Sequence, residues 1–176
     1  MPPPPAKWPS GRAPARAVES AAVHVDVKQV PVFFVLPLRQ RVLRPHQSVS
    51  EVGFEGDATG THFAAFDTSS AIVGVVSLIV EPPDESGTPS WRLRGMATEP
   101  ALQRHGVGRA LMTGLIDFVA RSGGGALWCN ARLHAVGFYE LFGFVVTGEV
   151  FEEPDIGPHV RMARVVEPSL SDPSPE

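Results

Sequence analysis

The sequence has little of what several function classes require. A single cysteine among 176 residues cannot form an intramolecular disulfide, as expected for a protein of a reducing compartment. The six histidines are scattered without the spacing of metal ligands, so we expect no bound metal. A net charge of −4 provides no general attraction to nucleic acid or to an anionic membrane surface. These absences leave a small molecule as the expected partner.

The two ends of the chain differ in composition from its middle. Residues 1–22 are rich in proline, alanine and basic side chains, and residues 167–176 are rich in proline, serine and acids. Large apolar groups are too few there to offset the entropy cost of ordering, so we expect both ends to be disordered. The N-terminal stretch also lacks the apolar core of a secretory signal, which predicts cytoplasmic residence. The composition supports one sizeable core, and we assign a single domain to residues 23–166.

The most informative segment is a glycine turn between a strand and a helix. Residues 91–97 are predicted as a strand, and an amphipathic helix is predicted from about Val107, with apolar residues every three or four positions. The first turn of a helix carries free N–H groups and a partial positive charge. Because positions 106 and 108 are glycine, a diphosphate can approach this backbone without meeting a Cβ atom. The segment therefore predicts a site for a phosphorylated ligand.

Two common nucleotide-binding motifs do not fit this turn. A Walker loop needs Lys-Ser or Lys-Thr, and neither dipeptide occurs in the chain. The dinucleotide fingerprint G-x-G-x-x-G fails at Leu111, although Ala110 blurs that test. On this segment alone, a nucleotide-binding domain of another class stays open as an alternative.

Two segments together resemble a known family. Residues 103–108, Gln-Arg-His-Gly-Val-Gly, resemble the Q/R-x-x-G-x-G/A signature of the GCN5-related N-acetyltransferase (GNAT) superfamily, in which this turn holds the pyrophosphate of acetyl-coenzyme A. Pro100 also stands where that family often has proline. Residues 139–144, Tyr-Glu-Leu-Phe-Gly-Phe, resemble the family's Tyr-Glu-x-x-Gly-Phe segment. The resemblance extends over residues 25–166.

The resemblance implies an α/β (α+β) fold, with a mixed, mostly antiparallel central sheet of about six to seven strands flanked by helices on both faces. Strands are predicted at residues 23–29, 61–66, 71–80, 91–97, 126–130, 144–151 and 159–166. The long helix ends at glycines 123–125, and a second helix precedes Phe144. Residues 31–43 fit a strand or a helix. Pro31 and Pro37 argue against a long helix, but we follow the family and expect one.

The resemblance also implies which residues hold acetyl-coenzyme A as cosubstrate. In the family, backbone N–H groups at the end of the strand before the turn polarise the thioester carbonyl, and this strand splays from its neighbour to pair with pantetheine. The expected cofactor-binding residues are Met96, Ala97, Thr98, Gln103, Arg104, His105, Gly106, Val107, Gly108, Arg109, Asn130, Arg132 and Phe138. Arg132 stands where the family often has asparagine, and Asn130 is the nearest asparagine.

Acyl transfer from a thioester to an amine proceeds by direct attack when both groups are held in line, and it needs an acid and a base. Tyr139, the only tyrosine, is the expected acid for the departing thiolate, as in the family; the alternative is a core tyrosine with a satisfied hydroxyl. Glu99 is the expected base, with His62 or His159 acting through water as alternatives. Cys129 is expected to be a small buried hydrophobe rather than a nucleophile.

The acceptor site is the least determined part of the sequence. Arg41 and Arg44 would share a helix face, and with His62 and His159 they are the expected substrate-binding residues, suited to an acidic group on a small amine. A solvated charged face explains the arginines equally well. We expect an acetyl-coenzyme A-dependent N-acetyltransferase acting on a primary amine of a small metabolite. The alternative is a non-catalytic acyl-coenzyme A-binding sensor or partner domain, and a homodimer is left open.

Overall fold

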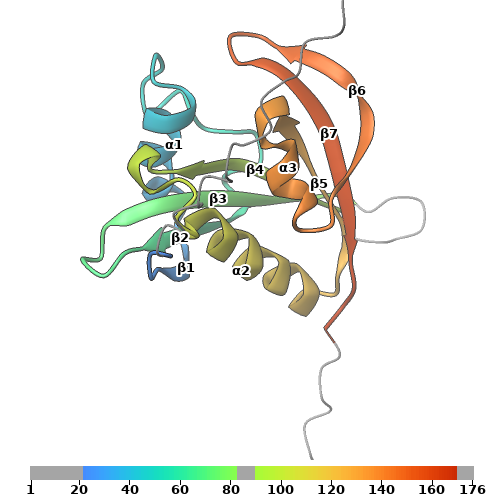
Figure 1. Ribbon diagram of the computed structural model, residues 1–176, viewed down its shortest axis with the longest axis horizontal. Helices are drawn as coiled ribbons and strands as arrows, with labels where there is room; N and C mark the ends of the chain where they lie inside the picture. The colour runs from blue at the N-terminus through green and yellow to red at the C-terminus, as the bar shows by residue number, and fades with distance from the viewer. Residues whose placement is uncertain (1–21, 83–89, 170–176) are drawn as a thin grey trace, which may run out of the picture.

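The computed structural model describes residues 22–82 and 90–169. Seven strands form one sheet in the order β1-β2-β3-β4-β5-β7-β6 (Figure 1). The strands are β1 (Asp26–Val30), β2 (Thr61–Phe66), β3 (Ile72–Glu81), β4 (Ser90–Thr98), β5 (Gly125–Arg132), β6 (Val145–Glu153) and β7 (Gly157–Val166). All neighbouring strands run antiparallel except β4 and β5, which run parallel. The predicted mixed, mostly antiparallel sheet is confirmed.

Three α-helices and three short 3₁₀ segments connect the strands. They are η1 (Val32–Phe34), α1 (Leu36–Leu43), η2 (Pro100–Leu102), α2 (Val107–Arg121), η3 (Leu133–Ala135) and α3 (Val136–Glu140). In the segment whose type was ambiguous, Pro31 precedes η1 and Pro37 lies in the first turn of α1. A proline in the first turn costs no helical hydrogen bond, so the two prolines shorten the helix without preventing it. None of the described helices has the length and apolar character needed to cross a membrane.

The sheet has an apolar core on each face. On β2, Phe63 and Ala65 belong to the larger core, which contains the apolar side of α2 together with Tyr139 of α3. Ala64, which points the other way, packs in a smaller core with Val35 and Leu38 at α1. This alternation is what a strand covered on both faces requires. Helices therefore flank the sheet on both faces, as expected.

The start of α2 lies unusually close to the sheet. A Cβ atom on Gly74 of β3 would stand 2.6 Å from Val107 Cγ1 and 2.9 Å from Leu111 Cδ1. A side chain at position 74 would therefore push the helix away from the sheet. Because glycine is present there, the glycine turn at residues 106–108 is held against the end of β4.

The middle of the sheet opens where β4 and β5 separate. Only Ser90, Trp91 and Arg92 pair with β5, although both strands continue for several residues. On its other edge β4 carries a bulge between the pairs Val75↔Ala97 and Ser77↔Arg94, with Gly95 at φ +59°. A bulge with a left-handed glycine increases local twist and re-aims the strand. The expected splay is present, and it leaves one edge of β4 without a partner strand from residue 93 onward.

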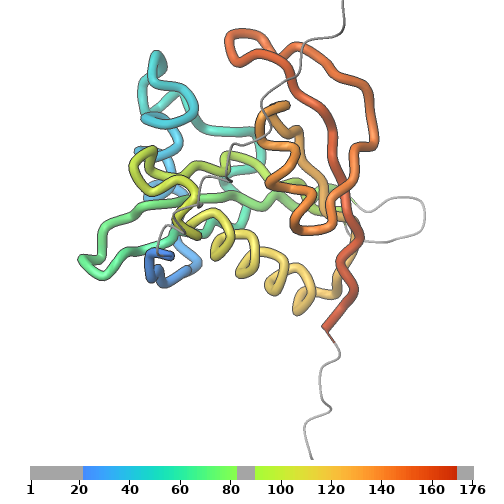
Figure 2. Tube along the Cα trace, in the orientation of Figure 1, coloured from blue at the N-terminus to red at the C-terminus, as the bar shows by residue number. Residues whose placement is uncertain are grey.

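Hydrogen bonds connect both ends of the domain to α2 or to the turn before it. The Val23 N–H donates to the carbonyl of His105 in the glycine turn. Figure 2 shows the first described segment of the chain (blue) beside the start of α2. At the other end of α2, the Ser169 N–H donates to the carbonyl of Ala120 at 2.8 Å. Residues 167–169 contact the domain through this hydrogen bond, and their expected disorder stays a prediction. The rest of that prediction, and the prediction for residues 1–21, lie outside the described residues.

Candidate active site

Two cavities occupy the opening between β4 and β5. The first has a volume of about 330 Å³ and lies between the end of α1, residues 92–98 of β4, and the strands β5 and β7. The second, of about 490 Å³, lies between the glycine turn and the segment η3–α3. They share a wall formed by Met96, Thr98, Gln103, His134, Ala135 and Tyr139. We call them the acceptor cavity and the turn cavity.

Tyr139 lies where the two cavities meet. Its ring is in the larger core, packed edge-on against Phe138 and Phe144, and the residue is 7% exposed. Among the described residues, the one hydrogen-bond partner of the hydroxyl is the Met96 sulfur at 3.9 Å, a weak acceptor. Burial, reinforced by the Cys129 sulfur, raises the pKa of this hydroxyl well above its usual value. Tyr139 therefore stays protonated at neutral pH and keeps a proton available for a group placed in either cavity.

The turn cavity contains most of the expected cofactor residues. Besides the shared wall, its lining includes Arg104, Gly106, Gly108, Arg109 and Phe138. Gly106 is the N-cap of α2 at φ +92°, a left-handed conformation that favours glycine, and it gives the first turn no side-chain cap. Arg104, just before it, also has a positive φ, of 63°. The turn thus exposes free backbone N–H groups between two arginines, which suits a phosphorylated ligand.

Other residues of the expected cofactor set lie elsewhere. His105 faces away from both cavities, with Nδ1 bonded to the Gln103 carbonyl at 2.8 Å. The Val107 side chain is fully buried in the core. Ala97, Asn130 and Arg132 line the acceptor cavity instead of the turn cavity, and Arg132 donates to the Leu43 carbonyl at 3.3 Å.

Two of the four residues expected to bind the acceptor line the acceptor cavity, namely Arg44 and His159. His62 does not: it is 3% exposed, and its ring nitrogens are bonded to the Ser77 hydroxyl and the Asp57 carbonyl. It belongs to a buried cluster in which Arg39 forms a bidentate ion pair with Asp57. Both ring nitrogens are occupied by protein groups, and the structure does not place His62 in the lining of the acceptor cavity. Its roles in substrate binding and as a base stay predictions.

Arg41 and Glu99 also lie outside both cavities. The two side chains form a surface ion pair at 2.6 Å that links α1 to the end of β4. The Glu99 carboxylate is therefore engaged by a cation, and neither residue lines either cavity. The structure does not bring Arg41 and Glu99 together with Tyr139, and their predicted roles stay predictions.

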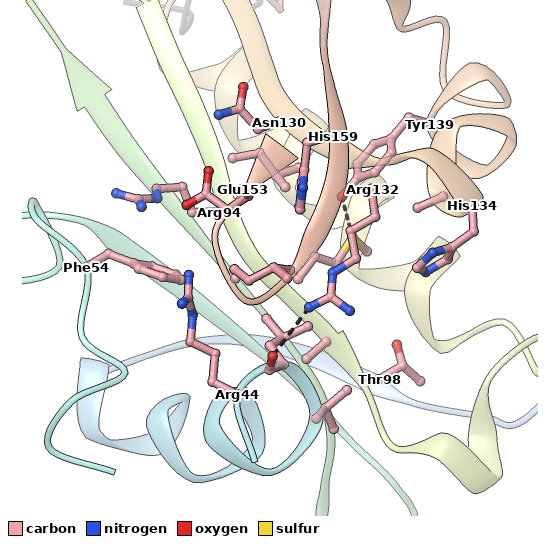
Figure 3. A pocket seen from close by; sticks show the side chains of 18 of the residues that line it. Arg44, Phe54, Arg94, Thr98, Asn130, Arg132, His134, Tyr139, Glu153 and His159 are labelled. Carbon is pink, nitrogen blue, oxygen red and sulfur yellow. Dashed lines mark hydrogen bonds between the residues drawn. The ribbon is translucent and has the colours of Figure 1, made fainter. Parts of the chain in front are cut away.

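His159 is differently placed. It is 7% exposed, lines the acceptor cavity and stacks on Phe151. Its Nδ1 lies 2.8 Å from the Gly157 carbonyl, which can only accept a hydrogen bond, so Nδ1 carries the proton in the neutral ring. Nε2 is then an unprotonated acceptor. Figure 3 shows the His159 ring directed into the cavity, near Arg132 and Glu153.

The sequence reasoning missed several lining residues, chiefly Phe54, Arg92, Arg94, His134 and Glu153. A signal for the two arginines existed in β4. Trp91 and Leu93 are buried, and strand alternation places Arg92 and Arg94 together on the opposite face. Phe54 and Glu153 come from a loop and from the sheet edge, and no local pattern connects them with β4.

Comparisons with known proteins agree with this geometry. The family model described as "Acetyltransferase (GNAT) domain" matches residues 40–166. The Bacillus subtilis (strain 168) protein named "Uncharacterized N-acetyltransferase YitI" is 32% identical over 147 residues, covering 82% of this chain and 99% of that protein. The crystal structure of Escherichia coli ElaA is 21% identical with a TM-score of 0.63, covering 80% of this chain and 99% of that one. An aminoglycoside 6'-N-acetyltransferase complexed with coenzyme A is 18% identical with a TM-score of 0.64, over 83% and 99% of the chains.

The splayed parallel pair, the glycine turn beside it and these matches define an acyltransferase. The chain belongs to the GNAT acetyltransferase family.

Proposed function

We propose that the protein is an acetyl-coenzyme A-dependent N-acetyltransferase that acetylates a primary amine of a small metabolite. The observation that carries the proposal is the wall shared by the two cavities, since it brings a ligand of the turn cavity and a ligand of the acceptor cavity together at Tyr139. Two substrates that react by direct attack must meet at one point. A cytoplasmic location is part of the same proposal, because acetyl-coenzyme A would be the second substrate there.

The turn cavity fits acetyl-coenzyme A. Of the described residues, a Cβ atom on Gly106 would meet only Ala22, at 3.6 Å, which leaves the backbone of the turn accessible to a phosphate. Arg104 and Arg109 add positive charge to that of the helix terminus. The unpaired edge of β4 from residue 93 offers backbone hydrogen bonds to an extended pantetheine. When bound, the cosubstrate supplies an acetyl thioester.

The chain's own residues then supply three functions. Free N–H groups near the bulge, at Met96 and its neighbours, polarise the thioester carbonyl. His159 Nε2 accepts a proton from the acceptor ammonium, so that the neutral amine can attack the carbonyl carbon. As the C–N bond forms and the C–S bond breaks, the Tyr139 hydroxyl donates its proton to the departing thiolate. The second amine proton passes to solvent, from which Tyr139 is reprotonated.

Direct attack also agrees with the state of Cys129. Its side chain is buried, and burial raises the pKa of the thiol to about 12. A thiol with that pKa is not a thiolate at neutral pH, and it is therefore a poor nucleophile. We accordingly propose transfer without an acyl-cysteine intermediate.

The alternative is a domain that binds acyl-coenzyme A without turnover. Mass spectrometry of products, after incubation with acetyl-coenzyme A and a broad amine panel, separates the two. We expect a mass gain of one acetyl group on at least one amine, with stoichiometric release of coenzyme A thiol. Tight coenzyme A binding with no acetylated product would favour the sensor. Absence of coenzyme A binding would overturn both.

A further inference from the structure

The acceptor cavity is strongly cationic in a protein that is acidic overall. Its lining contains four arginines, Arg44, Arg92, Arg94 and Arg132, against one carboxylate, Glu153, whereas the whole chain has a net charge of −4. A concave site lined by one sign of charge focuses the field on its contents. The cluster therefore sets which acceptors the cavity attracts.

Most of these guanidinium groups lack a carboxylate partner. Among the described residues, Arg44 and Arg94 make no ion pair or side-chain hydrogen bond, and Arg132 has only the Leu43 carbonyl. Arg92 Nη1 lies 3.9 Å from Glu81 Oε1, and the Arg92 guanidinium stacks on the Trp128 ring. Burial, followed by repulsion from Arg92, lowers the pKa of Arg94 below its usual value. An anion in the cavity would relieve this repulsion.

Arg94 is also held in place by packing against the Phe54 ring. Its guanidinium carbon lies 4.1 Å from the centre of the Phe54 ring, and the guanidinium carbon of buried Arg39 lies at the same distance. Arg39 is fixed in turn by its bidentate pair with Asp57. Two guanidinium groups so close to one ring must use its opposite faces, so Phe54 is clamped between them. A guanidinium fixed before binding loses little entropy when it forms a bidentate hydrogen bond.

We infer that the acceptor is an amine that carries an oxyanion, a carboxylate or a phosphate, which binds the arginines of the acceptor cavity with Arg94 as the principal contact. The amine then lies toward His159 and Tyr139, on the same cavity wall. Figure 3 shows Arg132 pointing into the middle of the cavity and Arg44 rising from the end of α1. This inference rests on the proposed function and adds the substrate class.

The phosphates of coenzyme A are not the anions that these arginines bind. Arg104, Arg109 and the glycine turn belong to the turn cavity, whereas Arg44, Arg92, Arg94 and Arg132 line only the acceptor cavity. Each cavity therefore has its own cations. Two anionic substrates require this if both must be bound at the same time.

Matched pairs of amines test the inference. Ethanolamine phosphate against ethanolamine and β-alanine against β-alaninamide differ in the anion while keeping the amine, and the two pairs distinguish phosphate from carboxylate; spermidine represents polycations. We expect kcat/KM to favour at least one anionic member by about tenfold or more.

Arg94→Gln should reduce that preference about ten- to hundredfold through the acceptor KM, and Arg94→Lys should reduce it less. The KM of acetyl-coenzyme A should not change in either variant. Arg41→Gln, outside the cavity, is the matched control.

The outcomes separate this inference from the proposed function. Equal use of both members of each pair, a preference for spermidine, or a higher KM for acetyl-coenzyme A in Arg94→Gln would overturn the anionic acceptor and leave the acetyltransferase intact. If no amine is acetylated, the proposed function fails, and calorimetry with ethanolamine phosphate and β-alanine in the presence of coenzyme A decides the inference. Binding that weakens in Arg94→Gln and Arg94→Lys but not in Arg41→Gln supports it, and any other result rejects it.

Discussion

At the scale of single residues, the Tyr139 hydroxyl combines burial with an almost empty hydrogen-bonding environment. Its one hydrogen bond to a described residue is with the Met96 sulfur, although the ring is packed on two sides. A buried hydroxyl normally finds a strong partner. The absence of one among the described residues, at a point shared by two cavities, suits a group whose partner arrives with the substrate.

Replacing Tyr139 by phenylalanine tests this role. Tyr139→Phe keeps the ring in the core and removes only the weak contact with Met96, so the free energy of unfolding should change by less than about 1 kcal/mol. If the hydroxyl protonates the thiolate, kcat should fall by roughly 10²-fold or more while the KM of acetyl-coenzyme A stays similar. Steady-state kinetics and thermal unfolding measure both quantities. An unchanged kcat would assign the proton to water or show that product release limits turnover.

The base can be tested in the same way at His159. His159→Gln keeps a polar group beside the Gly157 carbonyl but cannot accept a proton, so kcat should fall by about 10²-fold or more. Added imidazole should restore part of the activity, which a purely structural loss would not allow. His62→Gln is the comparison: it breaks buried hydrogen bonds, so it should lower the unfolding temperature, and imidazole should not rescue it. Rescue of neither variant would remove His159 from the mechanism.

The two histidines show where residue-level prediction ends. Both are single histidines on strands, and the sequence treats them as equivalent. Their difference arises from tertiary contacts: Ser77 and Asp57 occupy both nitrogens of His62, whereas the Gly157 carbonyl occupies one nitrogen of His159. The ion pair of Glu99 could not be predicted for the same reason, because its partner Arg41 is 58 residues away in sequence. Tyr139 was easier to identify, since it lies within a continuous motif.

At the scale of elements, local patterns located nearly every strand and helix. The hairpin of β2 and β3, the start of α2 at Val107 and the end of α2 before Gly123 follow from periodicity and glycine. Residues 31–43 could not be assigned from periodicity, because their two prolines fit several structures. The pairing of β5 with β7 instead of β6, and the contact of Gly74 with α2, depend on distant segments that no local pattern shows.

The glycine turn yields a prediction at this scale. At φ +92°, Gly106→Ala should cost about 1–2 kcal/mol of stability and also weaken acetyl-coenzyme A binding, so its two effects cannot be separated. Gly106→Asn separates them, because asparagine tolerates the left-handed conformation. Among the described residues, only Ala22 is within 4 Å of a Cβ atom at this position. We expect near-normal thermal stability with at least tenfold weaker acetyl-coenzyme A binding by calorimetry. The control is Gly108→Ala, at a position where the family accepts alanine, and this variant should bind acetyl-coenzyme A normally. A wild-type affinity for acetyl-coenzyme A in Gly106→Asn would reject the glycine turn as the phosphate-binding site.

At the scale of the whole molecule, the sheet brings together residues that the sequence scatters. The acceptor cavity combines the end of α1, the loop with Phe54, β4, β5 and β7. The resemblance to the GNAT family predicted that β4 splays from its neighbour, and the glycine turn predicted a site for a phosphorylated ligand beside this opening. The cationic character of the acceptor cavity was predicted from four residues, of which Arg44 and His159 line it. It arises because β4 and β5 place Arg92, Arg94 and Arg132 on the face opposite α2, where α1 leaves room.

This distribution of charge predicts a dependence on ionic strength. The molecule repels anions at a distance through its net charge of −4, and attracts them only near the arginine-lined cavity. Salt shortens the Debye length from about 14 Å at 50 mM to about 4 Å at 500 mM, so it should screen the attraction within the open cavity. At saturating acetyl-coenzyme A, kcat/KM for ethanolamine phosphate or β-alanine should fall severalfold over this range of sodium chloride. For ethanolamine and β-alaninamide, which lack the anionic group, kcat/KM should change less with salt or rise. In Arg94→Gln, kcat/KM for the anionic acceptors should depend less on salt. Parallel profiles for the members of a pair with and without the anionic group would show that the cavity's charge does not act on the acceptor.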